Sequence, residues 1–566
     1  MKKIFLLILI FLIISLNTES LDQSVLSDDF KEIINIDNEN NDFINMDAKD
    51  LTYKKMFYYF VLVSEELDKY EIYNRWFQNI ESNIESKLLD KFRRVDVANW
   101  QEGKQKEFAE NLLIFIHEIM FKRYYFYANK ISDIINKGEF NCVSSSIIYA
   151  VFLKKYGLRP AAVETIDHVF IKILFKNQEI DVETTNRLGF DPGKKKEILD
   201  NFGEITGFSY VSPKDYKNRN DIDLKKLLII VYHNLTNFYM NKGDFLKSAE
   251  IGYLIYKGRN DERGKNDFEI NFLNYINDLS KKNKNFEAVN TINSYIDYFD
   301  KNNKIFDTRF NLLNNYVYYW SNYNNTIDVN NFLLEQNKKY QELKNDRRFI
   351  EIYFQFTYKT ITFNNKNNNY QTSYNAVKDF NALFKHKDID KLFSNILIEE
   401  MNSYQKTNDY KKIEERLSTL KIEFSEYSGI IKNYEMIYSI NKIDFMLSNR
   451  AFLNALNEAK KLIIIFPDDQ KVKNALLSCY VKLAIYYYEN GDIKNVIYYS
   501  DEGLKKIPDN RTLRGNYIIF LKNFVNEELN KKNYREARKI LNIALEKFPK
   551  DSYFVNINNE LKSINY

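Results

Sequence analysis

Apolar residues recur at helical spacing along nearly the whole chain, and this pattern is interrupted in one place. From about residue 51 to 135, and again from about residue 225 onward, apolar positions follow the three- to four-residue spacing of amphipathic helices. Between these stretches, after the apolar segment SSSIIYAVFLKKY, the short runs AAVETI, HVFIKILF and QEIDVETT predict strands. We therefore expect a mainly α-helical protein with one small α+β unit around residues 125–215.

A repeat with a period near 41 residues organises the C-terminal part. Pro467, Pro508 and Pro549 follow one another at intervals of 41 residues. The turn that opens the second helix of each unit can be followed back to Phe245 at intervals of 40 to 43 residues, which predicts eight helix–turn–helix units. Because one helical hairpin cannot bury its apolar face alone, successive hairpins are expected to stack into a solenoid.

The N-terminus, MKKIFLLILIFLIISLNTES, has the pattern of a secretory signal peptide. Two lysines precede an apolar run of 13 residues, Ile4–Leu16, which is short for a membrane span. We predict a signal peptide over 1–20 and export to a periplasmic, cell-envelope or extracellular location; the alternative is an uncleaved anchor helix. No later stretch reaches about 18 apolar residues, so no stable transmembrane span is expected after signal removal. The acidic, Asn-rich residues 21–50 are expected to form a mobile leader.

Composition agrees with a helical, soluble-type chain and argues against several functions. The 566 residues include only 15 glycines and 6 prolines, so helix breakers are scarce. The net charge of +4, from 82 basic and 78 acidic residues, does not suggest a nucleic-acid partner. The two cysteines lie too far apart in the sequence to suggest a disulfide framework. Cys479, in an apolar helical stretch, is expected to be a small buried residue. His117 is expected to be a core histidine, and His233 and His386 are expected to be packing or surface residues. No phosphate-binding glycine loop or metal-ligand cluster occurs, so we expect no cofactor and no metal.

Cys142 lies where a nucleophilic thiol would be activated. A loop precedes it and a strongly apolar helix follows, and a helix N-terminus favours a thiolate. His168 opens the run HVFIKILF, and Asp181 and Glu183 follow on one face of the next strand. A base and an orienting acid are what a thiol nucleophile requires. The alternative is that Cys142 is a core thiol and His168 an ordinary strand residue.

This stretch resembles the transglutaminase-like cysteine-protease superfamily over about residues 130–195. The resemblance consists of a helix with an N-terminal Cys, a Gly-Leu pair and a Val after that helix, a His at the start of a strand, and an acid-x-Thr motif that ends the next strand. It implies a papain-related α+β fold in which Cys142 is the nucleophile, His168 the general base and then acid, and Glu183 the orienting acid. Asp181 is the second choice for that role. Two departures are Glu183, where the family has Asp, and Phe170, where it more often has Trp.

The implied chemistry is acyl transfer through a thioester. The oxyanion would be held by the Cys142 backbone N–H and a second donor, for which Asn136 is a speculative choice. Water would then give hydrolysis or deamidation, and an amine would give cross-linking. The sequence does not choose among these outcomes.

The repeated pattern Asn-x-x-Tyr-x-x-Ala, followed by aliphatic residues and Phe-Pro-x-Asp, resembles tetratricopeptide repeats over about residues 225–566. This implies binding of a protein or peptide. We predict a signal peptide (1–20), a leader (21–50), a helical region with a transglutaminase-like core (51–220) and the repeats (225–566). The first hypothesis is an exported thiol acyl-transfer enzyme, possibly an amide hydrolase, with a partner-binding array. The second is a non-catalytic repeat scaffold for protein–protein interaction with an inert α+β cap.

Overall fold

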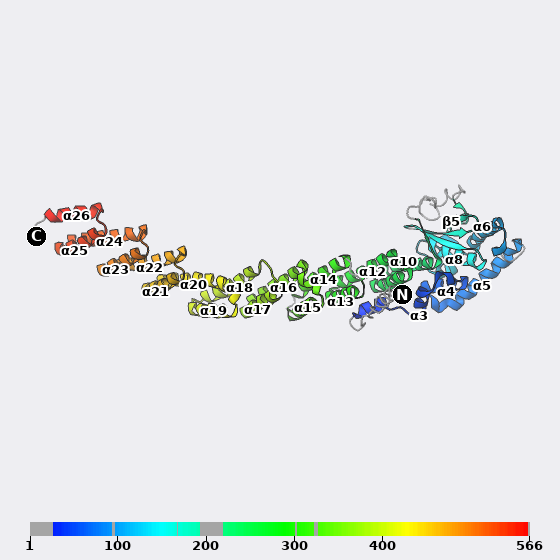
Figure 1. The fold of residues 1–566 in the computed structure, drawn as a ribbon, viewed down its shortest axis with the longest axis horizontal. Helices are drawn as coiled ribbons and strands as arrows, with labels where there is room; N and C mark the ends of the chain where they lie inside the picture. The colour runs from blue at the N-terminus through cyan, green and yellow to red at the C-terminus, as the bar shows by residue number, and fades with distance from the viewer. Residues whose placement is uncertain are drawn as a thin grey trace, which may run out of the picture. The chain divides into compact units, whose positions relative to one another are not determined.

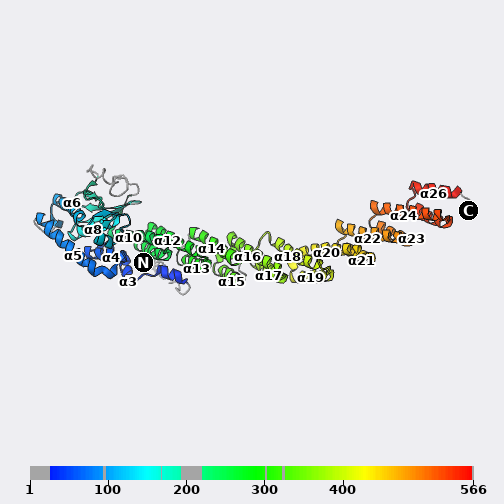
Figure 2. The ribbon, with the colours of Figure 1, turned by 180° about the vertical axis from the view of Figure 1, so that it is seen from behind.

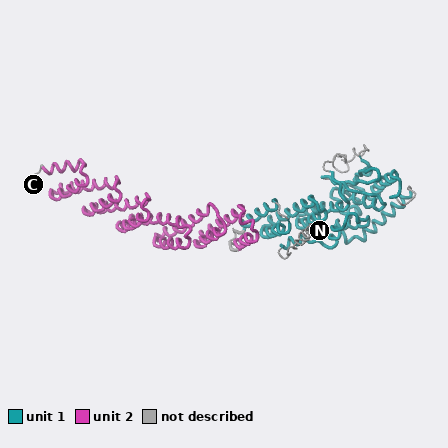
Figure 3. The backbone as a smooth tube through the Cα atoms, in the orientation of Figure 1, with its two compact units in different colours: residues 1–322 teal, residues 323–566 magenta. Residues whose placement is uncertain are grey.

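The computed structural model describes most of the chain and divides it into two compact units. Unit 1 covers residues 1–322 and unit 2 covers residues 323–566 (Figure 3). The described residues are 26–92, 97–166, 168–192, 219–299, 303–321 and 326–563. The predicted signal peptide lies outside them. Among the described residues, no helix has the length and apolar character needed to cross a membrane.

Unit 1 is built around a helix that is buried on nearly all sides. This helix, α8 (Cys142–Lys155), is mostly apolar, and its three serines, Ser144 to Ser146, are buried as well, so it lies at the centre of a core. It packs against α4 (Tyr53–Val63) and α10 (Leu224–Lys242), and α6 (Glu102–Ile119) also contacts it. Two further helices, α5 (Tyr70–Lys87) and α7 (Ile131–Lys137), contribute to the same core.

A four-stranded antiparallel sheet lies against α8 (Figures 1 and 2). Its strand order is β5-β4-β3-β6, and three of the four strands were predicted from the sequence. The small α+β unit is therefore confirmed, whereas β6 and the two-residue parallel pair β1–β2 were not predicted. The bounds are β1 Arg123–Tyr124, β2 Glu139–Phe140, β3 Pro160–Glu164, β4 Val169–Leu174, β5 Glu179–Val182 and β6 Asn220–Ile222.

The prediction of a mobile leader over 21–50 is wrong for the described residues of that segment. Two short helices form there, α2 (Asp28–Ile34) and α3 (Asn38–Asn45), each capped by the side chain of the residue before it. Helix α2 packs against α11 and α13, and α3 packs against α11 and α4. Phe30 is fully buried there among aromatic rings. Tertiary burial therefore orders a segment whose own sequence is weakly periodic.

Helical hairpins make up the rest of unit 1 and nearly all of unit 2. The second helices begin within one residue of the predicted positions. Most of the described turns before them have a Gly or Asn in the left-handed region, as at Gly243 and Gly491, and two have Arg450 and Lys532 there. Within each unit, successive helices contact one another. In unit 1 these are α10, α11 (Phe245–Arg259), α12 (Glu262–Lys281), α13 (Asn285–Tyr298) and α14 (Asn303–Ser321).

Unit 2 repeats the hairpin from α16 to the C-terminal helix, with the core of each layer shared between neighbours. Its described helices are α15 (Thr326–Lys339), α16 (Arg347–Lys366), α17 (Tyr370–Leu383), α18 (Ile389–Gln405), α19 (Tyr410–Glu423), α20 (Ser428–Ser448), α21 (Phe452–Ile465), α22 (Gln470–Glu489), α23 (Ile493–Lys506), α24 (Arg511–Asn530), α25 (Tyr534–Lys547) and α26 (Ser552–Ser563). The chain is thus mainly helical, as predicted.

Candidate functional site

Cys142 occupies the first position of α8, directly after a strong helix cap. The side-chain oxygen of Asn141 accepts hydrogen bonds from the backbone N–H groups of Val143 and Ser144, at 3.0 and 2.9 Å. The Asn141 amide in turn donates to the Phe126 carbonyl at 3.1 Å, so the loop before the helix is fixed. The cap does not use the Cys142 N–H. The thiol is carried by the first residue of a buried helix, where free backbone N–H groups give the helix end a partial positive charge.

His168 bridges Cys142 and Glu183. Its Nε2 lies 2.7 Å from Glu183 Oε2, and its ring is also hydrogen-bonded to the Cys142 side chain. Because Nε2 contacts the carboxylate, Nδ1 is the nitrogen left to face the thiol. The backbone of His168 is held by Thr165, whose hydroxyl accepts the His168 N–H at 3.1 Å. The structure thus brings together three of the predicted site residues.

Glu183 is fully buried and accepts several hydrogen bonds. Its Oε1 accepts from the Thr185 N–H at 3.1 Å and from the Thr185 hydroxyl at 2.7 Å, which leaves Oε2 for His168. A Cβ on Gly189 would lie 1.8 Å from the Glu183 carbonyl oxygen, so the turn after β5 requires glycine at that position. The carboxylate is therefore oriented before any substrate binds.

The charges of His168 and Glu183 stabilise each other. Burial alone lowers the pKa of His168, but the Glu183 carboxylate and Cys142 outweigh burial and raise that pKa well above its usual range. Burial alone raises the pKa of Glu183, but the charge and hydrogen bond of His168 lower it overall. The contact between the two side chains therefore favours the charged form of each, an imidazolium beside a carboxylate.

Helices α6 and α8 hold the strand end that carries Glu183. His117 Nε2 lies 3.0 Å from the Thr184 carbonyl oxygen, and as a donor it requires Nε2 to carry the proton. The Thr184 hydroxyl meets the Ser145 and Ser146 hydroxyls at 2.9 and 2.8 Å. His117 was predicted to be a core histidine, which is confirmed, and the structure adds its contact with the site.

Protonation of His117 is expected to destabilise unit 1. Burial is the largest effect and lowers the pKa of His117 to about 4. The unfolded chain therefore binds more protons between about pH 6.5 and pH 4, so the contribution of His117 is complete above pH 6.5 and is lost as the pH falls toward 4. We expect lowering the pH from 7.5 to 5.0 to cost wild type at least about 1 kcal/mol more than His117→Gln.

Urea unfolding followed by tryptophan fluorescence measures this loss, because all three tryptophans of the sequence lie in the range of unit 1. His117→Gln keeps an amide donor for the Thr184 carbonyl but cannot be protonated in this range. An equal loss of stability in the two proteins on acidification would contradict the assignment.

Asp181, the second choice for the acid, does not contact His168. Its carboxylate forms a two-point ion pair with Arg219, at 2.6 and 2.8 Å, and its register partner in β4 is Lys172. The sequence alternation placed Asp181 and Glu183 together, but only Glu183 lies beyond the paired part of β5, beside the histidine. The speculative oxyanion donor Asn136 is also wrong, because it is exposed on α7 and does not line the cavity described next.

A cavity of about 360 Å³ opens onto Cys142 and His168. Two different parts of unit 1 form its walls. The α+β side supplies Tyr124, Phe126, Asn141, Val143, Glu164, Thr165, Ile166 and Val169, and helices α10 and α12 supply Ile230, His233, Asn234, Asn237 and Arg263. The sequence did not predict this second wall, and His233 was expected only in packing or at the surface. The reason is that no rule of residue spacing links α10 and α12 to a site some 90 residues earlier in the chain.

The other cysteine and the other repeat histidine have no part in this site. Cys479 is fully buried in unit 2, and burial raises the pKa of its thiol to about 12. His386 stacks on Phe354 with ring centroids 3.8 Å apart. Both predictions, a buried small residue and a packing histidine, are confirmed.

Comparisons with known proteins do not assign the chain to a family. No protein-family model matches it, and no curated protein matches it. Among solved structures, the P58(IPK) TPR domain is similar at 12% sequence identity, with a TM-score of 0.15, over 59% of this chain and 88% of that chain. At that score the match does not establish a shared fold. The transglutaminase-like resemblance stays a prediction.

Proposed function

We propose that the protein is a thiol acyl-transfer enzyme with Cys142 as nucleophile, His168 as general base and acid, and Glu183 as the orienting acid. The observation that carries this proposal is the hydrogen-bonded series from Cys142 through His168 to the buried Glu183. A structural thiol does not require a buried histidine and a buried carboxylate beside it, since burying such groups is costly unless they are paired. A thiol nucleophile is activated by such a base with an orienting acid.

The mechanism follows from these positions. The Cys142 sulfur attacks the carbonyl carbon of an amide or ester, and the C–O double bond opens to an oxyanion. His168 then gives its proton to the leaving nitrogen or oxygen as the bond from the carbonyl carbon to that atom breaks and the C–O double bond re-forms, which leaves a thioester. Water, deprotonated by His168, attacks the thioester carbon; the carbon–sulfur bond breaks, Cys142 leaves as a thiolate and the acid is released, whereas an amine in place of water gives a new amide.

Two donors could hold the oxyanion, the one that the sequence already suggested and a second that replaces Asn136. The Cys142 N–H at the start of α8 is one, since the Asn141 cap leaves it unused. The Tyr124 hydroxyl is the other: Tyr124 lines the cavity, and burial together with the charges of Cys142 and Glu183 raises its pKa, so it stays protonated. A protonated hydroxyl beside the thiol is suited to stabilise a developing negative charge.

We further propose that the helical hairpins bind a protein or peptide partner and that the chain is exported. Stacked hairpins offer extended surfaces suited to such ligands. The apolar run after Lys2 and Lys3 supports export and lies outside the described residues. Within unit 2, a smaller cavity of about 200 Å³ lies between α15, α16 and α17 and is lined by polar and aromatic side chains.

A second function is a non-catalytic scaffold for protein–protein interaction. It is favoured by the large share of the described chain that consists of helical hairpins. It differs from the enzyme at one point, the reactivity of Cys142, so one measurement separates the two.

Alkylation by iodoacetamide at pH 6 tests the enzymatic proposal. We expect Cys142 to react at least about tenfold faster than a free cysteine derivative, because its sulfur is hydrogen-bonded to the His168 ring and lies at a helix N-terminus, the setting of reactive cysteines. Peptide mass spectrometry after timed labelling measures both cysteines in one sample. Cys479 is the internal control and stays unmodified in the folded protein, since it is fully buried. A Cys142 that reacts no faster than the free thiol would favour the scaffold.

A further inference from the structure

The first helical hairpins complete the cavity at Cys142. Helix α10 contributes three polar side chains, His233, Asn234 and Asn237, and the second residue of α12 contributes Arg263. On the opposite, α+β side, Phe126 and Ile166 are 55% and 69% exposed, which is unusual for such apolar residues. The cavity therefore has an exposed apolar edge on one side, formed by Phe126 and Ile166 and called the apolar lip below. On the other side it has a polar wall, formed by the polar side chains of α10 and by Arg263.

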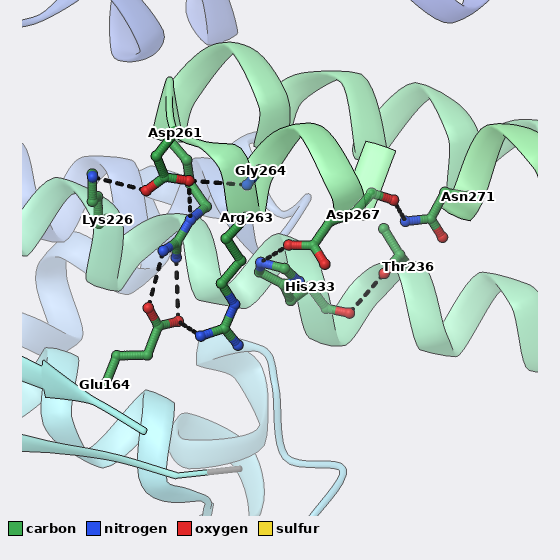
Figure 4. Close-up of polar contacts among 10 residues, drawn as sticks. Glu164, Lys226, His233, Thr236, Asp261, Arg263, Gly264, Asp267 and Asn271 are labelled. Carbon is green, nitrogen blue, oxygen red and sulfur yellow. Dashed lines mark hydrogen bonds and ion pairs between the residues drawn. The ribbon is translucent and has the colours of Figure 1, made fainter. Parts of the chain in front are cut away.

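A buried ion-pair network fixes this polar wall (Figure 4). Arg259 is 5% exposed and binds Glu164 through two nitrogens, at 3.0 and 3.2 Å, and it also contacts Asp261 at 3.2 Å. Asp261 caps α12 through the Gly264 N–H at 2.9 Å. Both oxygens of the Glu164 carboxylate therefore accept a hydrogen bond from Arg259, so the negative charge of Glu164 is already paired without Arg263.

Arg263 forms a single ion pair among the described residues. Its Nη1 lies 3.0 Å from Glu164 Oε1, the oxygen that also accepts from Arg259 Nη1. Its side chain is 42% exposed. A guanidinium has five N–H donors in a planar fork, so most of them remain open to a ligand in the cavity. Arg263 is also the one Lys or Arg among the described residues that line this cavity.

His233 adds hydrogen-bonding surface to this wall but no charge. Its Nε2 lies 3.1 Å from Asp267 Oδ2, and Figure 4 shows the ring turned toward that carboxylate. Burial first, then the neighbouring Arg259 and Arg263, lower the pKa of His233 to about 3. The positive charge available to a ligand at neutral pH therefore belongs to Arg263.

We propose that Arg263, flanked by Asn234 and Asn237, binds a carboxylate of the acyl donor and so determines specificity. The substrate class is a peptide-like amide or ester that carries a carboxylate near the scissile bond and an apolar group for the Phe126–Ile166 lip. A single fork that is partly shared with Glu164 suits a monoanionic carboxylate better than a doubly charged phosphate. The inference rests on the proposed function, since it names the substrate of the same site.

A pair of alkylating agents tests the carboxylate subsite without a known substrate. Iodoacetate and iodoacetamide react alike: the sulfur forms a bond to the CH₂ carbon and iodide leaves. They differ in one negative charge. We expect Arg263→Gln to lower the iodoacetate rate at Cys142 roughly three- to tenfold, as fits the loss of one nearby charge at a half-exposed site, and to leave the iodoacetamide rate within about twofold. An unchanged ratio of the two rates overturns the proposal.

Lys226→Gln is the matched control. Lys226 pairs with Asp261 at 2.9 Å in the same network but does not line the cavity. Its removal takes away the same charge and should leave the ratio unchanged. A ratio that falls as far in Lys226→Gln as in Arg263→Gln would mean a long-range field, not a binding contact, and would also overturn the proposal.

Protection of the wild-type protein gives a second measurement that does not depend on how a variant folds. N-acetylglycine should slow iodoacetamide labelling of Cys142 more than N-acetylglycinamide, which lacks the carboxylate; equal protection contradicts the subsite. A wild-type Cys142 inert to iodoacetamide contradicts the proposed function itself. A reactive Cys142 that is indifferent to charge contradicts the carboxylate subsite alone.

Discussion

Glu183→Gln is expected to lower the rate of Cys142 alkylation at pH 6 by roughly ten- to a hundredfold. The substitution keeps the size of the side chain and one acceptor oxygen, replaces the other oxygen by an NH₂ donor, and removes the buried charge that raises the pKa of His168. The largest contribution that raises the pKa of His168 is then lost, so burial, which lowers that pKa, is opposed by Cys142 but no longer by Glu183. The ring is therefore protonated less readily and is a weaker partner for the Cys142 sulfur. Timed iodoacetamide labelling of Cys142, followed by mass spectrometry, measures the effect.

Asp181→Asn is the matched control for this prediction. It makes the same chemical change two residues away, where the carboxylate pairs with Arg219 and not with His168. We expect its alkylation rate to stay within about twofold of wild type, because a partly exposed ion pair contributes little. If Asp181→Asn were slowed and Glu183→Gln were not, the acid of the site would be Asp181 and the geometry described above would be wrong.

His168→Ala separates charge from structure in the same assay. It removes the base and leaves Glu183 as an unpaired buried carboxylate, a change that costs about 3–5 kcal/mol where such pairs have been broken. We therefore expect slow alkylation together with a lower urea midpoint for unit 1. Glu183→Gln should slow alkylation with a smaller loss of stability, since an uncharged amide replaces the charge.

The sequence contained enough information to predict the three site residues, because each sits at a kind of position that sequence can specify. Cys142 follows a helix cap, His168 directly precedes a strand, and Glu183 directly follows the next strand, in a short motif. Which of Glu183 and Asp181 orients His168 could be decided only from the three-dimensional structure. Both alternate onto one face, and only the register of β4 against β5, with the turn that closes on Gly189, places Glu183 at the ring.

The wall formed by α10 and α12 could not be predicted for a different reason. Residues in one hairpin reveal their helical face through periodicity, but not which other segment that face will contact. Arg263 and Asn234 have the appearance of ordinary polar residues on amphipathic helices. Their proximity to Cys142 depends on the packing of α10 against α8, a tertiary contact between unlike elements.

The starts of the second helices were predicted to within one residue because the same turn recurs eight times at nearly constant spacing, so a clear turn fixes the position of a less clear one. The segment before α4 has no such redundancy. Its composition resembles that of disordered chains, yet the few apolar residues in it are enough to dock two helices onto the first hairpins. The hydrophobicity of a segment indicates how much apolar surface it can bury. It does not show whether another part of the protein offers a surface against which the segment can pack.

Phe30→Ala is therefore expected to release α2 from the first hairpins. Phe30 is fully buried, with ring centroids 6.0 Å from Phe272, 5.8 Å from Tyr298 and 6.3 Å from Phe299. Truncation of a buried Phe costs about 3–5 kcal/mol, which is large against the stability that one seven-residue helix can gain from docking. Hydrogen exchange of residues 28–34 should approach the rate of an unfolded segment, while α11 and α13 stay protected.

Glu32→Ala, on the exposed side of the same helix, is the control and should leave exchange in α2 nearly unchanged. The polar contacts of the segment do not compensate for the lost ring, since the Ser27 N–H bond to Ser294 and the Tyr275 bond to Asp29 each contribute about 1 kcal/mol. Persistent protection of α2 in Phe30→Ala would mean that the helix is held by α3 and the chain beyond it. Global loss of protection across α10 to α13 would instead make residues 26–50 an integral part of the core, without which the first hairpins do not fold.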